Sequence, residues 1–272
     1  MCNACVIDSV KQQMLSRRNL FRAGAAGLVA ATAGRVLSPR AAMAQTTGRV
    51  VDLTHTLDEA FPTWDGVPGI AYERMADFAA NGFQYFKINA SEHAGTHIDA
   101  PLHFTADGLS VDEIAPEHLV CPLCVVDIKA KAMDDANATV SAEDIEAWIS
   151  AHGEIPAGAC VAMNSGWAAK VGDPSFRSDN PEGTLAFPGF GKDATDLMAE
   201  LGVVALAVDT LSQDPGNSTD FAVHYSWLGS GRYGIENIAN LDAVPPAGAM
   251  LFAGIPKHRG GTGGQARVIA MV

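Results

Sequence analysis

The sequence predicts an α/β fold in a single compact domain. Short apolar runs that contain β-branched residues alternate along the chain with segments that carry helix-start and helix-stop residues, which is the order of elements in α/β proteins. No segment of about 20 to 50 residues recurs, so repeat architectures are excluded. The chain has 272 residues, of which 48% are hydrophobic, enough to bury a substantial core.

The apolar runs are predicted to be strands. They contain valine or isoleucine and are bounded by turn-forming residues, and runs that are apolar at nearly every position are typical of strands buried on both faces. The predicted strands are residues 50–53, 83–88, 124–128, 159–163, 203–208, 250–253 and 267–271.

Three segments are predicted to be helices. Ser141 precedes two acidic residues, a combination that favours a helix start, and predicts a helix that runs to His152. A helix over residues 192–201 is predicted to end at Gly202, because glycine readily adopts the left-handed conformation that closes helices. A shorter helix is predicted over residues 110–119.

Two long loops separate these elements, residues 172–191 and 209–220. Loops of this length in a compact domain are usually functional or mobile, so we expect them to shape a substrate pocket. Asp209 and Asp214 in the second loop either orient ligating histidines or cap turns, and the sequence favours neither role.

Residues 1–44 have the features of an export signal. A twin-arginine pair at positions 17–18 is followed by a weakly hydrophobic run over residues 23–34 and a small-x-small cleavage site, Ala-Met-Ala, at 42–44. The run is too short for a stable membrane anchor, and it lacks the polar face of an amphipathic surface helix. We therefore predict a cleaved Tat-type signal peptide, the Tat export machinery as a partner, and a periplasmic mature domain over 45–272 that is not membrane-bound.

The chain is acidic, with 18 Lys and Arg against 31 Asp and Glu and a formal net charge of −13. Six of the basic residues but only one acidic residue lie in the predicted signal peptide, so the mature domain is more acidic still. A surface of this charge repels nucleic acid and anionic membranes. We expect neither as a partner.

Two of the five cysteines would leave with the signal peptide. Cys121 and Cys124 have the spacing of a redox motif, but they open an apolar run that predicts a strand. Together with Cys160 they are too few for a disulfide framework, and the other two ligands of a zinc knuckle are absent from the sequence. Buried core thiols are predicted.

The segment 93–103, HAGTHIDAPLH, carries three histidines and an aspartate. Imidazole and carboxylate are preferred ligands of Zn²⁺, Mn²⁺ and Fe²⁺, and this density favours a catalytic metal site over scattered histidines. His97 and Asp99 project from the same face of an extended segment, and Gly95 allows His93 to bend toward them. His103 is better placed for proton transfer than for ligation, because imidazole titrates near neutral pH.

This motif, continued to Phe104, resembles the signature of the metal-dependent cyclase superfamily, which includes bacterial kynurenine formamidases and isatin hydrolases. The resemblance covers residues 50–272 and implies a swivelling β/β/α domain. It assigns metal binding to His93, His97 and Asp99, with the aspartate able to bridge to a second metal. It assigns the acid/base role to His103.

The resemblance also implies that His224 and Glu236 complete a second metal position. By themselves a lone histidine and a lone glutamate would carry little signal, since most such residues are packed or solvated. Near the C-terminus, Gln265 stands where a proline is usual in the family, which affects only the local turn.

These features predict a metal-dependent hydrolase that holds one or two ions of Mn²⁺ or Zn²⁺. The expected reaction is hydrolysis of a C–N bond in a small aromatic amide, either an N-formyl arylamine such as formylkynurenine or a cyclic amide such as isatin. Phe61 and Trp64 are expected to line the pocket for this small-molecule substrate. The family and general frequency favour a homodimer or homotetramer.

Three alternatives stay open. Lactones and esters are hydrolysed through the same kind of tetrahedral oxyanion, so a lactone or ester hydrolase could use the same site. A non-catalytic periplasmic ligand- or metal-binding protein would not require His103. A cupin-like oxygenase uses similar ligands but would need a redox-active metal and oxygen.

Overall fold

A curled sheet forms the centre of the fold. The computed structural model describes residues 48–177 and 184–272, and the predicted signal peptide lies outside them, as does part of the first long loop. Within the described residues this sheet has nine strands in the order β1-β13-β11-β5-β7-β9-β10-β4-β12. Their bounds are β1 Val50–Asp52, β4 His97–Asp99, β5 Val120–Asp127, β7 Cys160–Asn164, β9 Ala205–Val208, β10 Tyr233–Glu236, β11 Ala249–Gly254, β12 Gly263–Gln265 and β13 Arg267–Met271.

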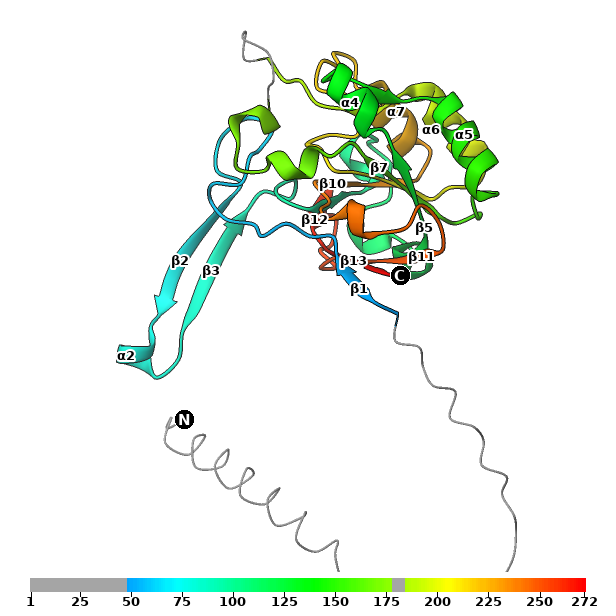
Figure 1. Ribbon diagram of the computed structural model, residues 1–272. Helices are drawn as coiled ribbons and strands as arrows, with labels where there is room; N and C mark the ends of the chain where they lie inside the picture. Colours follow the sequence, from blue (N-terminus) through cyan, green and yellow to red (C-terminus); the bar gives the residue numbers. More distant parts are fainter. Residues whose placement is uncertain (1–47, 178–183) are drawn as a thin grey trace, which may run out of the picture. The chain divides into compact units, whose positions relative to one another are not determined.

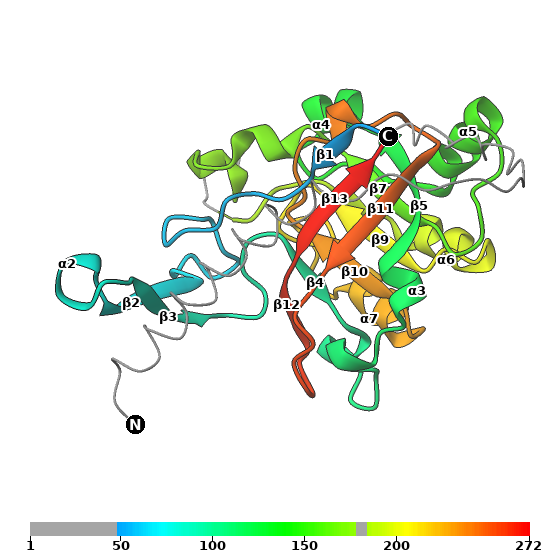
Figure 2. The ribbon, with the colours of Figure 1, turned by 90° about the horizontal axis from the view of Figure 1, so that it is seen from below.

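The middle of the sheet is parallel and its two flanks are antiparallel. Strands β5, β7, β9 and β10 run parallel, and β11 and β4 begin the antiparallel flanks. Ala266 alone separates β12 from β13, so one stretch of chain serves both flanks and the sheet must curl (Figure 2). Backbone hydrogen bonds from Leu53 to Val268 and from Ala239 to Leu53 join strands across the curl.

Helices pack on the outer face of the parallel strands (Figure 1). Ser141 and Asp144 form a capping box at the start of α5. Strand residues such as Val161 pack with the helices, and alternate residues such as Ala162 face a second core inside the curl. No helix in the described part of the chain is both long and apolar enough to span a membrane. The helices of this layer are α4 Lys129–Asp134, α5 Ala142–His152, α6 Lys192–Glu200 and α7 Ala222–Gly229.

The predicted α/β class is confirmed, and each predicted strand overlaps an observed one. The helix predicted over 110–119 is wrong as a single element. It consists of a 3₁₀ turn, Val111–Glu113, and the short helix α3, Pro116–Leu119. The break occurs because Ala115 precedes a proline and is extended, with φ −62° and ψ 130°. Several elements were not predicted: strands β2 (Ile70–Ala76), β6 (Thr139–Val140), β8 (Gly189–Phe190), β10 and β12, and helices α2 (Phe78–Asn81), α4 and α7.

The cysteine prediction is confirmed. Cys121 and Cys124 lie three residues apart on β5, so they point into the two different cores and cannot act as a redox pair. Both, with Cys160, are buried free thiols. Burial raises the pKa of Cys121 and Cys124 to about 11, which keeps them protonated and unreactive.

Two smaller ribbons complete the structure. β6 (Thr139–Val140) pairs with β8 (Gly189–Phe190). Residues 70–90, called the arm from here on, extend away from the main sheet (Figure 1). The arm comprises β2 (Ile70–Ala76), the short helix α2 (Phe78–Asn81) and β3 (Tyr85–Ala90).

Candidate metal centre

Strand β4 brings the first predicted ligands together with one from far downstream. It lies between β10 and β12 and is antiparallel to both. His97 and Asp99 share one face of β4, and Glu236 on β10 stands directly opposite His97. All three side chains are buried. Their ligand atoms lie within 4.8 Å of one another, so the sheet register assembles the group.

Glycines flank Asp99 on both neighbouring strands, Gly234 on β10 and Gly263 on β12. A Cβ at Gly234 would lie 2.1 Å from Nε2 of Gln213, and one at Gly263 would lie 2.6 Å from Cε1 of His93. The glycines therefore leave room for two donors to Asp99. His93 Nδ1 donates to Oδ1 at 2.7 Å, and Gln213 Nε2 donates to Oδ2 at 2.7 Å.

His97 presents an unpartnered nitrogen to the carboxylates. Its Nδ1 donates to the Gly95 carbonyl at 2.8 Å, which leaves Nε2 as the free ring nitrogen. Nε2 is buried, makes no hydrogen bond, and lies 3.2 Å from Asp99 Oδ1 and 3.4 Å from Glu236 Oε2. Burial opposes ionisation of His97, but the two carboxylates outweigh it and raise its pKa to about 9. Two carboxylates facing one imidazole nitrogen require a positive charge between them.

His224 reaches the same group from α7. Its Nε2 lies 3.3 Å from Glu236 Oε1 and 3.5 Å from Asp99 Oδ2. Its Nδ1 donates to Asp214 Oδ2 at 2.6 Å, and Asp214 also accepts the backbone N–H groups of Val223 and His224. Asp214 thus fills both roles that the sequence left open: it orients a histidine and caps the start of α7.

His93 and His103 form the more accessible side of the site. The His93 side chain is 24% exposed, and its ring stacks on His103 with centroids 3.8 Å apart. His93 Nε2 contacts Thr262 Oγ1 at 3.0 Å, and Thr262 donates to Glu92. Both ring nitrogens of His93 are therefore engaged, so it can bind a metal only after one of these hydrogen bonds breaks. Burial lowers the pKa of His103 to about 4, despite the attraction of Asp99.

A row of aromatic rings leads from solvent to these histidines. Trp64 is 40% exposed and lies 5.7 Å from Phe221, which is 5.7 Å from Phe104, which is 4.5 Å from the His224 ring. Phe221 begins α7 in the left-handed region at φ 49°, a strained conformation for a bulky residue. Trp64 thus connects to the site. Phe61 is buried instead, and its ring contacts are with His55 and Phe176.

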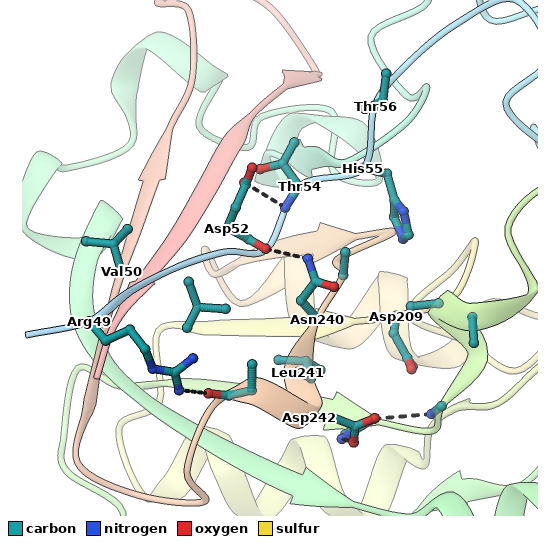
Figure 3. A pocket seen from close by; sticks show the side chains of 17 residues that line it. Arg49, Val50, Asp52, Thr54, His55, Thr56, Asp209, Asn240, Leu241 and Asp242 are labelled. Carbon is teal, nitrogen blue, oxygen red and sulfur yellow. Dashed lines mark hydrogen bonds between the residues drawn. The ribbon is translucent and has the colours of Figure 1, made fainter.

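Asp209 has a structural role away from the histidines. It lines a cavity of about 600 Å³ beside β1, whose lining includes none of the six predicted metal-binding and acid/base residues (Figure 3). Asp209 accepts hydrogen bonds from Ser165 and from the Trp167 backbone, so it caps the turn after β7. Burial raises its pKa to about 6.

The main contact that sequence reasoning missed is Gln213. Its side chain holds Asp99, and its backbone N–H donates to Glu236 Oε1 at 3.0 Å. It therefore fixes a carboxylate from each of two strands. In the sequence, only its place beside Asp214 in the long loop 209–220 indicated a functional role. Loop length does not identify which residue of the loop has that role.

Residues 51–215 match the Cyclase family. The chain belongs to this family. An isatin hydrolase from Roseibium aggregatum is 29% identical over 75% of this chain and 82% of its own length. A kynurenine formamidase from Salinibacter ruber is 26% identical over 81% of this chain and 96% of its own length. Among solved structures, isatin hydrolase A from Ralstonia solanacearum superposes with a TM-score of 0.77 at 34% identity, covering 89% of this chain and 99% of its own.

The site fits the metal dependence of the family. Within the described residues, two groups of side chains can each hold an ion, and they share Asp99: His97, Asp99 and Glu236 form one, and His93, Asp99 and His103 the other. The donor set of imidazoles and carboxylates suits Mn²⁺ and Zn²⁺. The strongest single indication of a cation is His97 Nε2, because a buried ring nitrogen without a hydrogen-bond partner needs a ligand.

Proposed function

We propose that this chain is a metal-dependent hydrolase that cleaves the C–N bond of a small aromatic amide. Isatin-like cyclic amides are the first candidate class, and N-formyl arylamines such as formylkynurenine are the second. The observation that carries the proposal is the buried, unpartnered Nε2 of His97 between two carboxylates. Similarity to isatin hydrolases and kynurenine formamidases supports the substrate class.

In this proposal His97, His224, Asp99 and Glu236 would hold a Mn²⁺ or Zn²⁺ ion, and His93 could join them after giving up one of its hydrogen bonds. A bound cation would polarise the amide carbonyl and acidify water. The two oxygens of Asp99 support occupancy by one or two ions, because Oδ1 lies near His93 and His97 whereas Oδ2 lies near His224.

The chain's own groups supply the proton transfer. His103 has no side-chain hydrogen bond among the described residues, so its ring nitrogens are free to exchange protons. It takes a proton from the attacking water as the water oxygen adds to the carbonyl carbon, and it gives that proton to the nitrogen as the C–N bond breaks. The products are an amine and a carboxylic acid, which releases the second proton of the water to solvent as it ionises to a carboxylate.

The aromatic row provides the place for the substrate ring. Phe104 lies beside His103, with ring centroids 4.8 Å apart, so a ring packed on the row would bring its amide to the histidines. Trp64 forms the outer end of the row. This arrangement supports Trp64 as a substrate contact more strongly than Phe61.

The cellular setting belongs to the proposal as well. Export by the Tat pathway rests on the twin-arginine segment and the cleavage site in residues 1–44. A homodimer or homotetramer rests on general frequency and on the family resemblance. N-terminal sequencing of the secreted protein tests the first, and sedimentation tests the second.

The central experiment combines metal analysis with substrate profiling. The purified protein is analysed for metals by elemental mass spectrometry and assayed with isatin, formylkynurenine, an aryl lactone and an aryl ester. His103→Ala should keep the metal and lose turnover, and His118→Ala, which changes an exposed histidine, should keep both. Turnover of the lactone or ester alone would move the assignment to that class. Absence of metal even after reconstitution with Mn²⁺ and Zn²⁺ would overturn the proposal.

A further inference from the structure

The sheet register that assembles the carboxylates also places a threonine beside His93. Gly263 on β12 stands opposite Asp99 on β4, and Figure 2 shows the two strands side by side. Thr262 comes just before β12, and its carbonyl accepts the backbone N–H of Ala100 at 2.9 Å. The pairing therefore extends one residue beyond the strand. Because Gly263 has no side chain, the His93 ring lies over β12 and reaches Thr262.

The His93 ring bridges Asp99 and Thr262. Its Nδ1 lies 2.7 Å from Asp99 Oδ1, and its Nε2 lies 3.0 Å from Thr262 Oγ1. An imidazole binds a metal ion through a nitrogen that carries no proton, and the hydrogen bond of the other nitrogen decides which one that is. The hydrogen bonds of Thr262 therefore determine how His93 can enter the site.

Thr262 has a single hydroxyl proton, and Glu92 accepts it. The Thr262 hydroxyl donates to Glu92 Oε2 at 2.5 Å, and the backbone N–H of Thr262 donates to the same oxygen at 3.2 Å. A carboxylate only accepts hydrogen bonds, so the direction of the O–H bond is fixed. Thr262 Oγ1 is left as an acceptor toward His93, and the proton between them belongs to Nε2.

The pair formed by Glu92 and Thr262 is itself held in place. A Cβ at Gly261 would lie 3.0 Å from Glu92 Oε1, so this glycine leaves room for the carboxylate. Gln265, at the end of β12, donates from its side chain to the carbonyls of Ser91 and Glu92, the second at 3.3 Å. A proline at this position would make neither bond. The glutamine that departs from the family resemblance thus fixes the backbone just before the first histidine of the motif.

We propose that Thr262 and Glu92 are positioning residues that keep a proton on His93 Nε2, so that Nδ1 is the nitrogen that binds the cation. This inference rests on the metal site proposed above and names the hydrogen bond that breaks there. The Nδ1 proton shared with Asp99 passes to solvent as the cation takes its place, and the contact between Nε2 and Thr262 stays. A histidine ligand whose other nitrogen is fixed in this way is better oriented and more basic.

The role of the Thr262 hydroxyl is tested by measuring Zn²⁺ affinity in competition with a chelator. Thr262→Val keeps the shape of the side chain and the backbone hydrogen bonds but removes the hydroxyl, so the affinity should fall about 10- to 100-fold. Thr262→Ser retains the hydroxyl and should restore most of the affinity. Thr56→Val, at an exposed threonine, is the matched control and should stay within about twofold of the wild type.

The direction of the hydrogen bonds is tested by Glu92→Ala. Without the carboxylate the Thr262 hydroxyl is free to donate to His93 Nε2, which favours the other tautomer. Zn²⁺ affinity should therefore fall about 10-fold. Equal affinities for Glu92→Ala and the wild type would overturn the assigned direction of the O–H bond.

A spectroscopic measurement separates the state of the ring from a merely structural effect. Long-range proton–nitrogen NMR spectra of isotope-labelled protein report which ring nitrogen carries a proton, and His93→Gln assigns the His93 signals. Nε2 should carry a proton in the metal-free protein and keep it when Zn²⁺ is added, while the Nδ1 signal changes. A wild type in which Nε2 lacks the proton or binds Zn²⁺ would overturn the inference.

This inference and the hydrolase proposal fail in distinguishable ways. If the wild type binds no metal, the hydrolase proposal fails, and the spectra of the metal-free protein still test the Nε2 proton. If the wild type binds metal and turns over substrate, unchanged Zn²⁺ affinity in Thr262→Val overturns this inference alone. If Thr262→Val does not fold, the wild-type spectra and Glu92→Ala decide.

Discussion

The two sides of Asp99 are built differently. On one side His97, His224 and Glu236 are buried, and each imidazole has its second nitrogen fixed by a backbone carbonyl or a carboxylate. On the other side His93 and His103 are partly exposed and stack on each other. Fixed, buried donors suit the holding of a cation, whereas accessible imidazoles suit exchange of protons with substrate and water. In the proposed function the buried side of Asp99 holds the cation and His103 on the accessible side transfers protons, while His93 can join the ligands once one of its hydrogen bonds breaks.

The largest effect is expected from the residue that both sides share. Asp99→Asn removes the charge that faces three histidines, so the protein should lose bound metal, and kcat/KM should fall by about 10⁴-fold or more. Elemental analysis and steady-state kinetics measure the two losses. Asp112→Asn changes an aspartate in the 3₁₀ turn Val111–Glu113, after the motif, and is the control. A variant that keeps stoichiometric metal would show that Asp99 is not a ligand.

The accessible side is tested by His103→Ala. Because His103 is assigned to proton transfer, kcat should fall by about 10²- to 10⁴-fold while metal content stays at the wild-type level. The opposite pattern, loss of metal with the protein still folded, would place His103 among the ligands, beside His93 and Asp99. His118→Ala controls for removal of a histidine.

The buried side of the site is tested by changing Asp214, which accepts a hydrogen bond from His224. Asp214→Asn weakens the hydrogen bond that orients His224, so metal affinity should fall about 10- to 100-fold, measured by competition with a chelator. Asp220→Asn, in the same loop and exposed, should have no effect. Equal affinities for both variants would mean that Asp214 serves only to cap α7.

A smaller effect on the same side is expected from Gly234→Ala. The new Cβ would overlap the Gln213 side chain and push it from Asp99, so metal affinity should fall about 10-fold and the free energy of unfolding by about 1–3 kcal/mol. Gly254→Ala on β11, whose Cβ would lie 3.6 Å from the nearest atom, is the control. Unchanged affinity would show that Gln213 is dispensable for holding the carboxylate.

We expect Asp209 to affect the free energy of unfolding and not the metal site or turnover. Because burial raises its pKa from 3.8 to about 6, the folded state holds the proton more tightly than the unfolded state does. Protonated Asp209 therefore stabilises the folded state fully below about pH 4. This stabilisation declines as the pH rises to about 6 and is then lost. Urea titrations from pH 4 to 8 should show this decline in the wild type relative to Asp209→Asn, with kcat equal in both.

The sequence was sufficient for the parts of the site that are close along the chain. The alternation of His97 and Asp99 predicted their shared face, because a strand has a period of two. Gln213 and the two glycines could not be predicted, since their roles depend on the register between β4, β10 and β12. The pairing of His224 with Glu236 came from the family resemblance, because two isolated residues have no pattern.

The fold shows the same division. Helix α5 was predictable because Ser141 and its acids give a local start signal. Helix α7 was not, because it begins at Phe221 in a left-handed conformation that no side-chain rule anticipates. The helix predicted over 110–119 failed because Pro116 overrides an otherwise helical pattern.

The long reach of the contacts around Asp99 has a consequence for folding. Gln213 and Asp99 are 114 residues apart in sequence, and His93 and Thr262 are 169 apart. Contacts of such separation incur a large loop-closure entropy and slow folding, so the site forms late, when distant strands have paired. A partly folded chain presents only the local histidines of the motif, without the buried nitrogen geometry. For the metal site proposed above, the fraction of chains that bind metal tightly would therefore measure how much of a preparation has reached its native state.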